Sequence, residues 1–593
     1  MPATRGKKRF LPEIGSPAYH LMLSVVSILV LGPLGGISSA FMNFSIGFFV
    51  GGQVLAGILG SVVTLPYGPE GKHGANYMQT MAASVANMCA MAVLIQARHW
   101  LGLPDVEAWR LVAFYCCIGM FGTGVGMLYT PVLVDRMQLM YPSGYAVANI
   151  LRALTDPELL RRSLAKLGGG TAVGYLLGLA TLNIPKVAKT GLSSSTFGAG
   201  MIVGARLAIP AMVVALIGYF SQPYLVTIGW LHKEDPFRKI GFIISLGTIL
   251  GAALIDIVLI LIEAYGRFRE KSAEPTAPVE DWKRVNTLRL ILWTVVWAVA
   301  VVVVGHWVMG EPTKYLLVVV GLSFLFVLVN GISLGISDWN PISSAFVLGV
   351  FILSAIGLTS PGTGLMCASI LLIACSVGGD MQQDRSTGWR LGTNRITQFR
   401  YQMIGIVFGA IFAVILARIF LQAFPVLKVD QFGHDVPGAQ QWQSAMTYKF
   451  VGAIRGITES QPHVLKALWL GIVIGLATEI IRKLVKRSAR YKKFSHGSAV
   501  GKTTDFIFDA VVMPSPYASS FGGFVEIVAV IWWTAGGVAG SLFNVIASRK
   551  KSAAKDALPA DMSTMSLVGG GLIAGDSLAA LTVGVYGLLT TVL

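Results

Sequence analysis

The chain has 593 residues, of which 54% are hydrophobic and 13% are charged, and 68 are glycine. This balance, with a mean hydropathy of +0.68, excludes a soluble globular protein. Repeated apolar runs of about 20 residues, each long enough to cross a bilayer as a helix, predict a polytopic membrane protein. The net charge of +17 lies between these runs, where the positive-inside bias explains it better than nucleic-acid binding does.

We expect an all-α fold of about 14–16 transmembrane helices in two duplicated halves, with broken or re-entrant segments. A broken, re-entrant or missed span is expected between the basic connections 136–166 and 267–289, and another span between 503 and 548. The reason is that an odd number of spans, three in the first interval and one in the second, cannot join two cytoplasmic ends. The candidate spans, in chain order, are 19–41, 44–65, 76–97, 109–131, 168–184, 196–220, 239–265, 288–308, 314–336, 342–358, 361–379, 401–424, 464–481, 519–545 and 563–593.

Basic connections set the expected orientation in the plasma (inner) membrane. Residues 1–18 form a basic tail, 267–289 a basic linker, and 482–502 carry eight Lys or Arg and no acid. The positive-inside rule predicts that all three are cytoplasmic. The loop 425–445, with Lys428 as its one basic residue, is expected to face outward.

The linker 267–289 divides the chain into a first membrane repeat, 19–266, and a second, 290–593, which includes the loop 482–502. Three matching pairs at nearly one offset support this duplication: ISSAF at 37–41 and 342–346, Met-Gln at 78–79 and 381–382, and Arg-x-x-Thr-acid at 152–156 and 455–459. Such duplication is common in secondary transporters. The matches leave open whether the halves are parallel or inverted.

The segment from Gly378 to Arg400 is the most polar stretch in membrane-like surroundings, with two aspartates, four arginines and four glycines. Polar, non-helical backbone at membrane depth persists only where protein buries it or water lines it. The segment is therefore either a cytoplasmic turn or the wall of a substrate path. Asp380 and Asp384 share one face if the segment is helical. The arginines after them either attract a substrate carboxylate or are only positive-inside charges.

This segment resembles the D-x-x-Q-D-x-K-T-G-x-x-L-G-x-x-x-x-x-Q signature of the oligopeptide transporter family, which includes the yellow-stripe-like metal-chelate carriers. Ser386 stands where that family usually has Lys. Three more segments are similar to family motifs and follow the family's order: 76–84 (NYMQTMAAS), 141–154 (YPSGYAVANILRAL) and 571–578 (GLIAGDSL). We expect this chain to be a prokaryotic member of the family.

The resemblance implies a carrier of oligopeptides or peptide-like metal chelates, driven by proton symport. We expect the substrate site to be formed by polar and charged residues of two of these segments. They are Asp380, Gln383, Asp384, Arg385, Arg390, Arg395, Asn76 and Gln79.

Three carboxyl groups inside apolar runs are candidates for carrying the proton: Glu526, Asp576 and Asp256. Glu526 and Asp576 have no basic residue nearby in the sequence. A carboxyl in such surroundings is neutral or hydrogen-bonded most of the time, which suits a proton carrier. The alternative is a structural hydrogen bond to a neighbouring helix.

Motifs for catalysis are missing. The segment 497–503 is one residue short of a phosphate-binding loop and has no preceding strand. The five cysteines lie in apolar runs without a C-x-x-C pattern, so they are predicted to be core residues. We expect no enzyme, cofactor, resident metal or nucleic-acid partner. The expected partners are the transported solute, protons and lipid, and the oligomeric state stays open.

The predicted function is secondary active transport by alternating access around a midplane site. A membrane channel, or a structural membrane component without proton coupling, is the alternative.

Overall fold

The computed structural model is all-helical, with no strand in the residues it describes. These residues are 11–45, 53–155, 157–233, 235–237, 239–241, 243–245, 247–252, 254–255, 280–337, 340–431, 442, 444–455, 462–524, 527–550 and 564–592. The predicted all-α class is therefore confirmed.

The helices before the basic linker are α1 (Pro17–Val26), α2 (Gly32–Ser45), α3 (Gln53–Thr64), α4 (Gly71–Cys89), α5 (Val93–Trp100), α6 (Ala108–Thr130), α7 (Pro142–Thr155), α8 (Pro157–Asn183), α9 (Pro185–Ala188), α10 (Ser194–Val203) and α11 (Ala205–Thr227). Those after it are α13 (Thr287–Trp307), α14 (Thr313–Ser337), α15 (Ile342–Ala355), α16 (Pro361–Leu391), α17 (Arg395–Ala423), α18 (Ala445–Arg455), α19 (Pro462–Arg487), α20 (Ala489–Gly497), α21 (Ala499–Ile507), α22 (Pro516–Phe524), α23 (Ile527–Lys550) and α24 (Thr564–Val592).

Nine helical segments among the described residues are long and apolar enough to cross a membrane. Their burial differs sharply. The most apolar stretch within 56–100, which contains α4 and α5, is 100% buried, and that of α16 is 89% buried. The stretch that contains α13 is 17% buried, and that of α11 is 28% buried. Helices α4 and α16 therefore form the centre, while α11 and α13 expose apolar side chains as lipid-facing helices do.

The structure contains a broken segment between the basic connections 136–166 and 267–289, where the sequence predicted a broken, re-entrant or missed span. The predicted span 196–220 is divided at Gly204, whose φ of +85° ends α10 before α11 begins. A left-handed backbone of this kind favours glycine, which has no Cβ to clash. In the second half, the predicted span 519–545 covers the end of α22 and most of α23, and residues 525–526 between them lie outside the described residues.

The basic connection 136–166, predicted as a loop, contains a buried helix, so that prediction is wrong. Helix α7 occupies most of 136–166, and its Val147, Ala148 and Leu151 are fully buried. A second buried helix, α18, follows the loop 425–445 and lies between the predicted spans 401–424 and 464–481; its Phe450 and Val451 are also fully buried. Both helices were missed because short polar and basic residues beside the apolar ones lower the mean hydropathy of these stretches.

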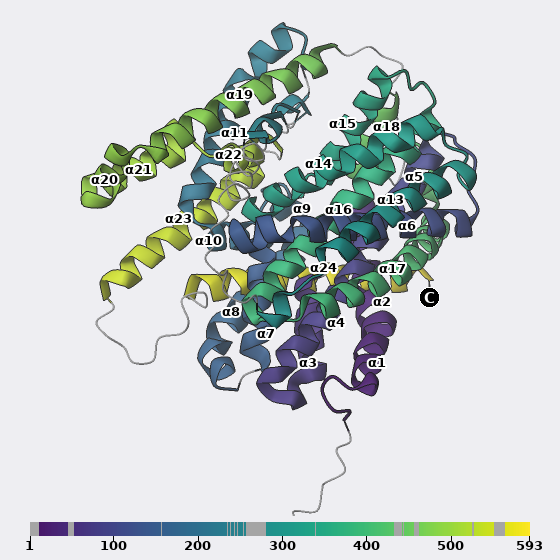
Figure 1. The fold of residues 1–593 in the computed structure, drawn as a ribbon, viewed down its shortest axis with the longest axis horizontal. Helices are drawn as coiled ribbons and strands as arrows, with labels where there is room; N and C mark the ends of the chain where they lie inside the picture. The colour runs from purple at the N-terminus through teal and green to yellow at the C-terminus, as the bar shows by residue number, and fades with distance from the viewer. Residues whose placement is uncertain are drawn as a thin grey trace, which may run out of the picture.

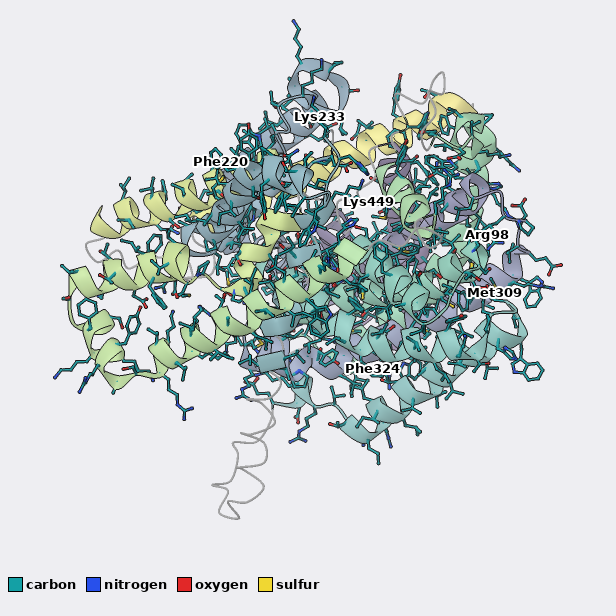
Figure 2. All side chains as sticks on the ribbon, turned by 90° about the horizontal axis from the view of Figure 1, so that it is seen from above. Arg98, Phe220, Lys233, Met309, Phe324 and Lys449 are labelled. Carbon is teal, nitrogen blue, oxygen red and sulfur yellow. The ribbon has the colours of Figure 1, made fainter. Side chains whose placement is uncertain are left out.

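The central helices approach closely because glycine lines their contacts. A Cβ on Gly126 of α6 would lie 2.5 Å from the carbonyl oxygen of Gly378 in α16. A Cβ on Gly405 of α17 would lie 2.4 Å from the carbonyl oxygen of Met81 in α4. Figure 1 shows α16 among these helices, whereas α19, α20 and α21 extend away from them. Figure 2 likewise shows Phe220 of α11 well away from Arg98 of α5.

The central bundle has two ends that the contacts define. At one, which we call the Gly392 end, His73 lies 3.1 Å from Thr393, and Tyr67 donates to the carbonyl of Pro12. The Trp282 ring of the basic linker lies at the same end, 5.6 Å from the Arg395 guanidinium. At the other, the Trp100 end, the Trp100 indole donates to the carbonyl of Leu427. The N-terminal segment and the described part of the linker thus share one end.

Candidate functional site

The polar segment after Gly378 continues α16 as a helix as far as Leu391. The interpretation of this stretch as a turn is therefore wrong. Ser360 caps the helix start, where its side chain accepts from the Thr363 N–H, and Pro361 follows at the first helical position. Gly392, with a φ of +70°, ends the helix in the left-handed conformation. The turn is confined to the three residues 392–394.

Helices α4 and α16 are antiparallel, and their polar residues face each other. Gln79 donates to Asp384 Oδ1 at 2.6 Å, and the Ser84 hydroxyl donates to Asp380 Oδ2 at 3.3 Å. Asn76 lies about one helical turn before Gln79 on α4, opposite Gly388 of α16. We call this set the polar seam; it comprises Asn76, Gln79, Thr80, Ser84 and Asn87 of α4 and Asp380, Asp384 and Gly388 of α16.

Two more helices close the polar seam with amide side chains. Gln53 of α3 donates to Asp380 Oδ1, and Gln402 of α17 lies 3.5 Å from Asp380 Oδ2. Gln398 of α17 donates to the Thr80 hydroxyl at 2.9 Å and to the carbonyl of Asp384 at 2.8 Å. The sequence prediction did not include Gln53 or Gln402 in the site. A polar amide inside an apolar run, one turn after Gln398, is the signal that could have found Gln402.

Arg385 is fully buried beside the polar seam and has neutral hydrogen-bond partners. Its Nη1 donates to Gln398 Oε1 at 2.9 Å, and its Nε lies 3.1 Å from the Met381 sulfur. Among the described residues, its Nη2 has no hydrogen-bond partner, and no carboxylate lies within 4.0 Å of its guanidinium nitrogens. A buried guanidinium with an unsatisfied N–H group is costly unless a partner arrives.

Gln383 and Arg390, two other predicted site residues, face α7 instead. The Gln383 backbone packs so closely that a Cβ on Gly144 would lie 2.8 Å from its carbonyl oxygen. Arg390 donates to the carbonyl of Met140 at 3.1 Å and stacks over the Tyr145 ring at 4.9 Å. These contacts hold the end of α16 against the segment 141–154. They lie outside the polar seam.

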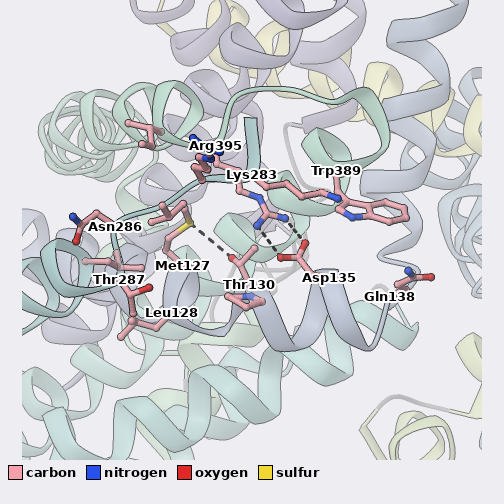
Figure 3. Close-up of a pocket in the computed structure, with 15 residues that line it drawn as sticks. Met127, Leu128, Thr130, Asp135, Gln138, Lys283, Asn286, Thr287, Trp389 and Arg395 are labelled. Atoms are coloured by element: carbon pink, nitrogen blue, oxygen red, sulfur yellow. Dashed lines mark hydrogen bonds and ion pairs between the residues drawn. The ribbon is translucent and has the colours of Figure 1, made fainter. Parts of the chain in front are cut away.

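Arg395 lies at the Gly392 end, in the wall of a cavity of about 980 Å³. Its guanidinium forms an ion pair with Asp135 through both terminal nitrogens, with 2.8 Å between Nη1 and Oδ2 (Figure 3). Lys283 and Arg284 of the basic linker line the same cavity, together with Trp389. The cavity is thus open to the linker and carries more positive than negative side chains.

Asp576, one of the three carboxyl groups predicted to carry the proton, lies outside the polar seam. Asp576 of α24 accepts both the backbone N–H, at 3.3 Å, and the hydroxyl of Ser195 near the start of α10. These contacts match the structural alternative for Asp576. Glu526 and Asp256 lie outside the described residues.

Three of the four motif segments therefore converge on one helix. Segment 76–84 lines one side of α16, and segment 141–154 packs on another side through the Thr387 hydroxyl, which donates to the Gly144 carbonyl at 3.0 Å. Segment 571–578 packs on α8, where a Cβ on Gly571 would lie 2.4 Å from the carbonyl oxygen of Leu167, and the preceding Gly570 meets Ala146 of α7. A polytopic helical protein with charged residues sealed in its centre is of the membrane transporter class, since ionisable groups inside spans mark solute and ion pathways.

Comparison with known proteins agrees. The family model described as OPT oligopeptide transporter protein matches residues 21–184 and 270–586. The chain belongs to the oligopeptide transporter family. Members of this family are transporters and not enzymes.

Similar curated proteins include three described as probable metal-nicotianamine transporters. Rice YSL6 is 21% identical over 569 residues, which cover 80% of this chain and 82% of that protein. Arabidopsis thaliana YSL8 is 20% identical over 409 residues (58% and 56%), and rice YSL12 is 21% identical over 436 (63% and 60%). The chain thus spans little more than half the length of the last two.

Proposed function

We propose that this protein imports oligopeptides or peptide-like metal chelates across the plasma membrane by proton symport, with a cytoplasmic N-terminus. The relatives described as metal-nicotianamine transporters make such chelates the first solutes to examine. Both substrate types carry carboxylates and amides, which require cationic and amide partners inside the protein.

The observation that carries the proposal is the state of Arg385. Its guanidinium is buried, adjoins the polar seam, and has an unpartnered Nη2 among the described residues. Asn76 is also fully buried, and neither its Oδ1 nor its Nδ2 has a partner there. A substrate carboxylate on Arg385 and a peptide-like amide on Asn76 would satisfy these groups. Gln79, whose Oε1 is free, would extend the same contact surface.

The cavity at the Gly392 end is the proposed cytoplasmic vestibule. Its volume of about 980 Å³ is at the upper end for small-molecule sites, which run to roughly 1,000 Å³. Lys283, Arg284 and Arg395 line it and are ion-paired with Glu280, Asp281 and Asp135, respectively. These ammonium and guanidinium groups are the partners we expect for solute carboxylates that enter the cavity.

Two matching contacts support halves of inverted orientation, as alternating access commonly uses. Arg152 donates to the Arg390 carbonyl in the last turn of α16, and Arg455 donates to the carbonyl of Trp100, the last residue of α5. Because α4–α5 and α16 are antiparallel, these contacts lie at opposite ends of the bundle. Helices α8 and α19 follow the two arginines with 27 and 26 residues.

The starts of α7 and α18 agree with this relation. Tyr141 and Ser444 both have positive φ, 45° and 43°. Each donates its N–H to a carbonyl in the other half, Tyr141 to Gly335 at 2.8 Å and Ser444 to Phe44 at 3.0 Å. The ISSAF pair does not occupy matching positions, because one copy lies in the middle of α2 and the other at the start of α15.

Uptake into proteoliposomes tests the proposed function. The purified full chain is supplied with peptides of two to five residues or with metal–nicotianamine complexes, with and without an imposed pH gradient. A symporter accumulates one of them above the outside concentration only when the gradient is present. Uptake that only equilibrates under the pH gradient would contradict proton symport and favour the channel.

Arg385→Gln tests the site itself, and Arg110→Gln, an exposed arginine at the Trp100 end, is the matched control. Loss of one charge-assisted hydrogen bond, worth ~1.5–3 kcal/mol, should weaken the apparent substrate affinity by about 10- to 100-fold. Equal affinity in Arg385→Gln and wild type would remove Arg385 from the substrate site.

A further inference from the structure

The two carboxylates of the polar seam are surrounded by neutral partners. Asp380 and Asp384 are 3% and 0% exposed and lie one helical turn apart. The partners of Asp380 are Gln53, Ser84, Asn87 and Gln402. Within the described structure, no lysine or arginine nitrogen lies within 4.0 Å of either carboxylate. Two uncompensated carboxylates in such a place are very costly.

Unsatisfied oxygen atoms point to what is missing. Gln79, Gln402 and Asn76 are fully buried, and the side-chain carbonyl oxygen of each has no hydrogen-bond partner in the described residues. The amide nitrogens of Gln79 and Gln402 donate to Asp384 and Asp380, so both side chains border the same pair of carboxylates. Carboxylate, amide and hydroxyl oxygens form the ligand set that hard cations prefer.

In the absence of substrate, the charge balance favours a monovalent cation. The charged groups that act on Asp384 are Asp380 and Arg385 of its own helix, and the neighbours from α3, α4 and α17 are neutral. Two carboxylates and one guanidinium leave a net charge of −1. One monovalent cation neutralises this charge, whereas a divalent ion would reverse it. The described residues contain no cluster of three His, Cys, Asp or Glu that could hold a metal ion.

We propose that Asp380 and Asp384 together hold one monovalent cation, either a proton or Na⁺, in the polar seam. This inference rests on the proposed symport, because it makes that cation the ion that travels with the substrate; a proton would match the proposed proton symport, and Na⁺ would replace the proton as the coupling ion. A substrate carboxylate on Arg385 removes the compensating charge and raises the demand for the cation. The bound cation in turn stabilises the substrate anion. Each ligand therefore increases the affinity for the other, as symport requires.

Cation binding is measured on the purified full-length protein in detergent, without any transported solute. In one arm, the melting temperature is followed as NaCl replaces choline chloride at constant ionic strength and pH. A bound ion stabilises the folded protein in a saturable manner. In the other arm, infrared spectroscopy records the C=O stretch of protonated carboxyl groups at neutral pH. The sodium arm identifies Na⁺, and the infrared arm identifies a proton.

The variants Asp380→Asn and Asp384→Asn should each abolish the wild-type signal, and Asp105→Asn, an exposed acid, should retain it. Gln79→Met, which keeps both carboxylates, should shift the sodium midpoint or the carboxyl titration even if the Asn variants fold poorly. Wild-type protein with neither signal, or a signal unchanged in all three seam variants, would overturn the cation site. Failure of the proposed function is distinct, because it would leave the cation signal intact while no peptide or chelate is accumulated.

Discussion

Gln79 donates its amide N–H to Asp384 Oδ1 at 2.6 Å, and the two residues are 305 positions apart in the chain. One belongs to the segment 76–84 and the other to the signature segment, so a single hydrogen bond joins two motifs that share no local sequence context. This bond lies in the middle of the polar seam. Substitutions in the polar seam should affect binding of the transported solute and ion more than folding. Substitutions at the surrounding glycine contacts should affect folding more than binding.

Gly405→Ala should destabilise the protein, because its Cβ would lie 2.4 Å from the Met81 carbonyl and force α17 away from α4. Overpacking of this kind costs ~1–3 kcal/mol. Gly362→Ala is the matched control, since the nearest atom to its Cβ would be a Leu103 side-chain carbon at 3.6 Å. Thermal unfolding in detergent should show a lower melting temperature for Gly405→Ala alone. Equal melting temperatures would contradict the close packing of α4 and α17.

Asp135→Asn should destabilise the protein more than Arg395→Gln does. The Arg395 side chain is 5% exposed and that of Asp135 is 29% exposed, so the guanidinium is the harder charge to leave alone. Breaking a buried ion pair costs about 3–5 kcal/mol of stability. The loss is smaller when the charge that remains is the one that water can reach. Melting temperatures of the two single variants and the double variant measure this asymmetry. The opposite order would mean that Arg395 is hydrated from the cavity.

Asp505→Asn should remove part of the stability in a pH-dependent manner. Burial raises the pKa of Asp505, but hydrogen bonds from Tyr491 and Arg206 outweigh this effect and hold the pKa below its usual range. A carboxyl whose folded pKa is depressed contributes stability above its unfolded pKa of about 3.9 and loses it as pH falls through the folded value. The melting temperatures of wild type and Asp505→Asn should therefore differ at neutral pH and converge in acid.

Asp281→Asn serves as the control for this measurement, because its side chain is 90% exposed. A constant difference between wild type and Asp505→Asn from neutral to acidic pH would show that the aspartate acts through packing and not through its charge.

Cysteine labelling from outside intact cells should miss cysteines placed at Ser272 and Ser488, since both are predicted to be cytoplasmic. A cysteine at Asp105 should be labelled, because this exposed residue lies at the Trp100 end, opposite the N-terminal segment. Variants are made without the five native cysteines, which are free thiols. Labelling at Ser272 and not at Asp105 would reverse the orientation.

Asp576→Asn should lower solute accumulation and solute exchange in equal proportion, or leave both unchanged. Its carboxylate is engaged by the hydroxyl and N–H of Ser195, and asparagine keeps one acceptor oxygen for these donors. A proton carrier would behave differently, because its loss stops accumulation driven by a pH gradient and spares exchange. That second pattern, at normal protein yield, would restore Asp576 as the coupling residue.

The sequence predicted the candidate site in part. It placed Asp380, Asp384, Asn76 and Gln79 together, and the polar seam contains all four. It also placed Gln383, Arg390 and Arg395 there, but these bind α7 and Asp135 instead. The helical period separates Gln383 and Arg390 from the seam residues, since these two side chains project from another side of α16. Which neighbour each side meets depends on helices more than 200 residues away.

Composition and hydropathy by themselves determined that the chain is a polytopic helical membrane protein, because apolar runs of this length have no other stable environment. The motifs determined the family, since their residues and order are local properties of the chain. Only the tertiary structure decided that residues 378–391 are a buried helix and that 142–155 is a second one. A polar helix in a membrane protein is stable when other helices supply its partners. Gln53, Ser84 and Gln402 supply them here, and their placement depends on how α3, α4 and α17 pack around α16.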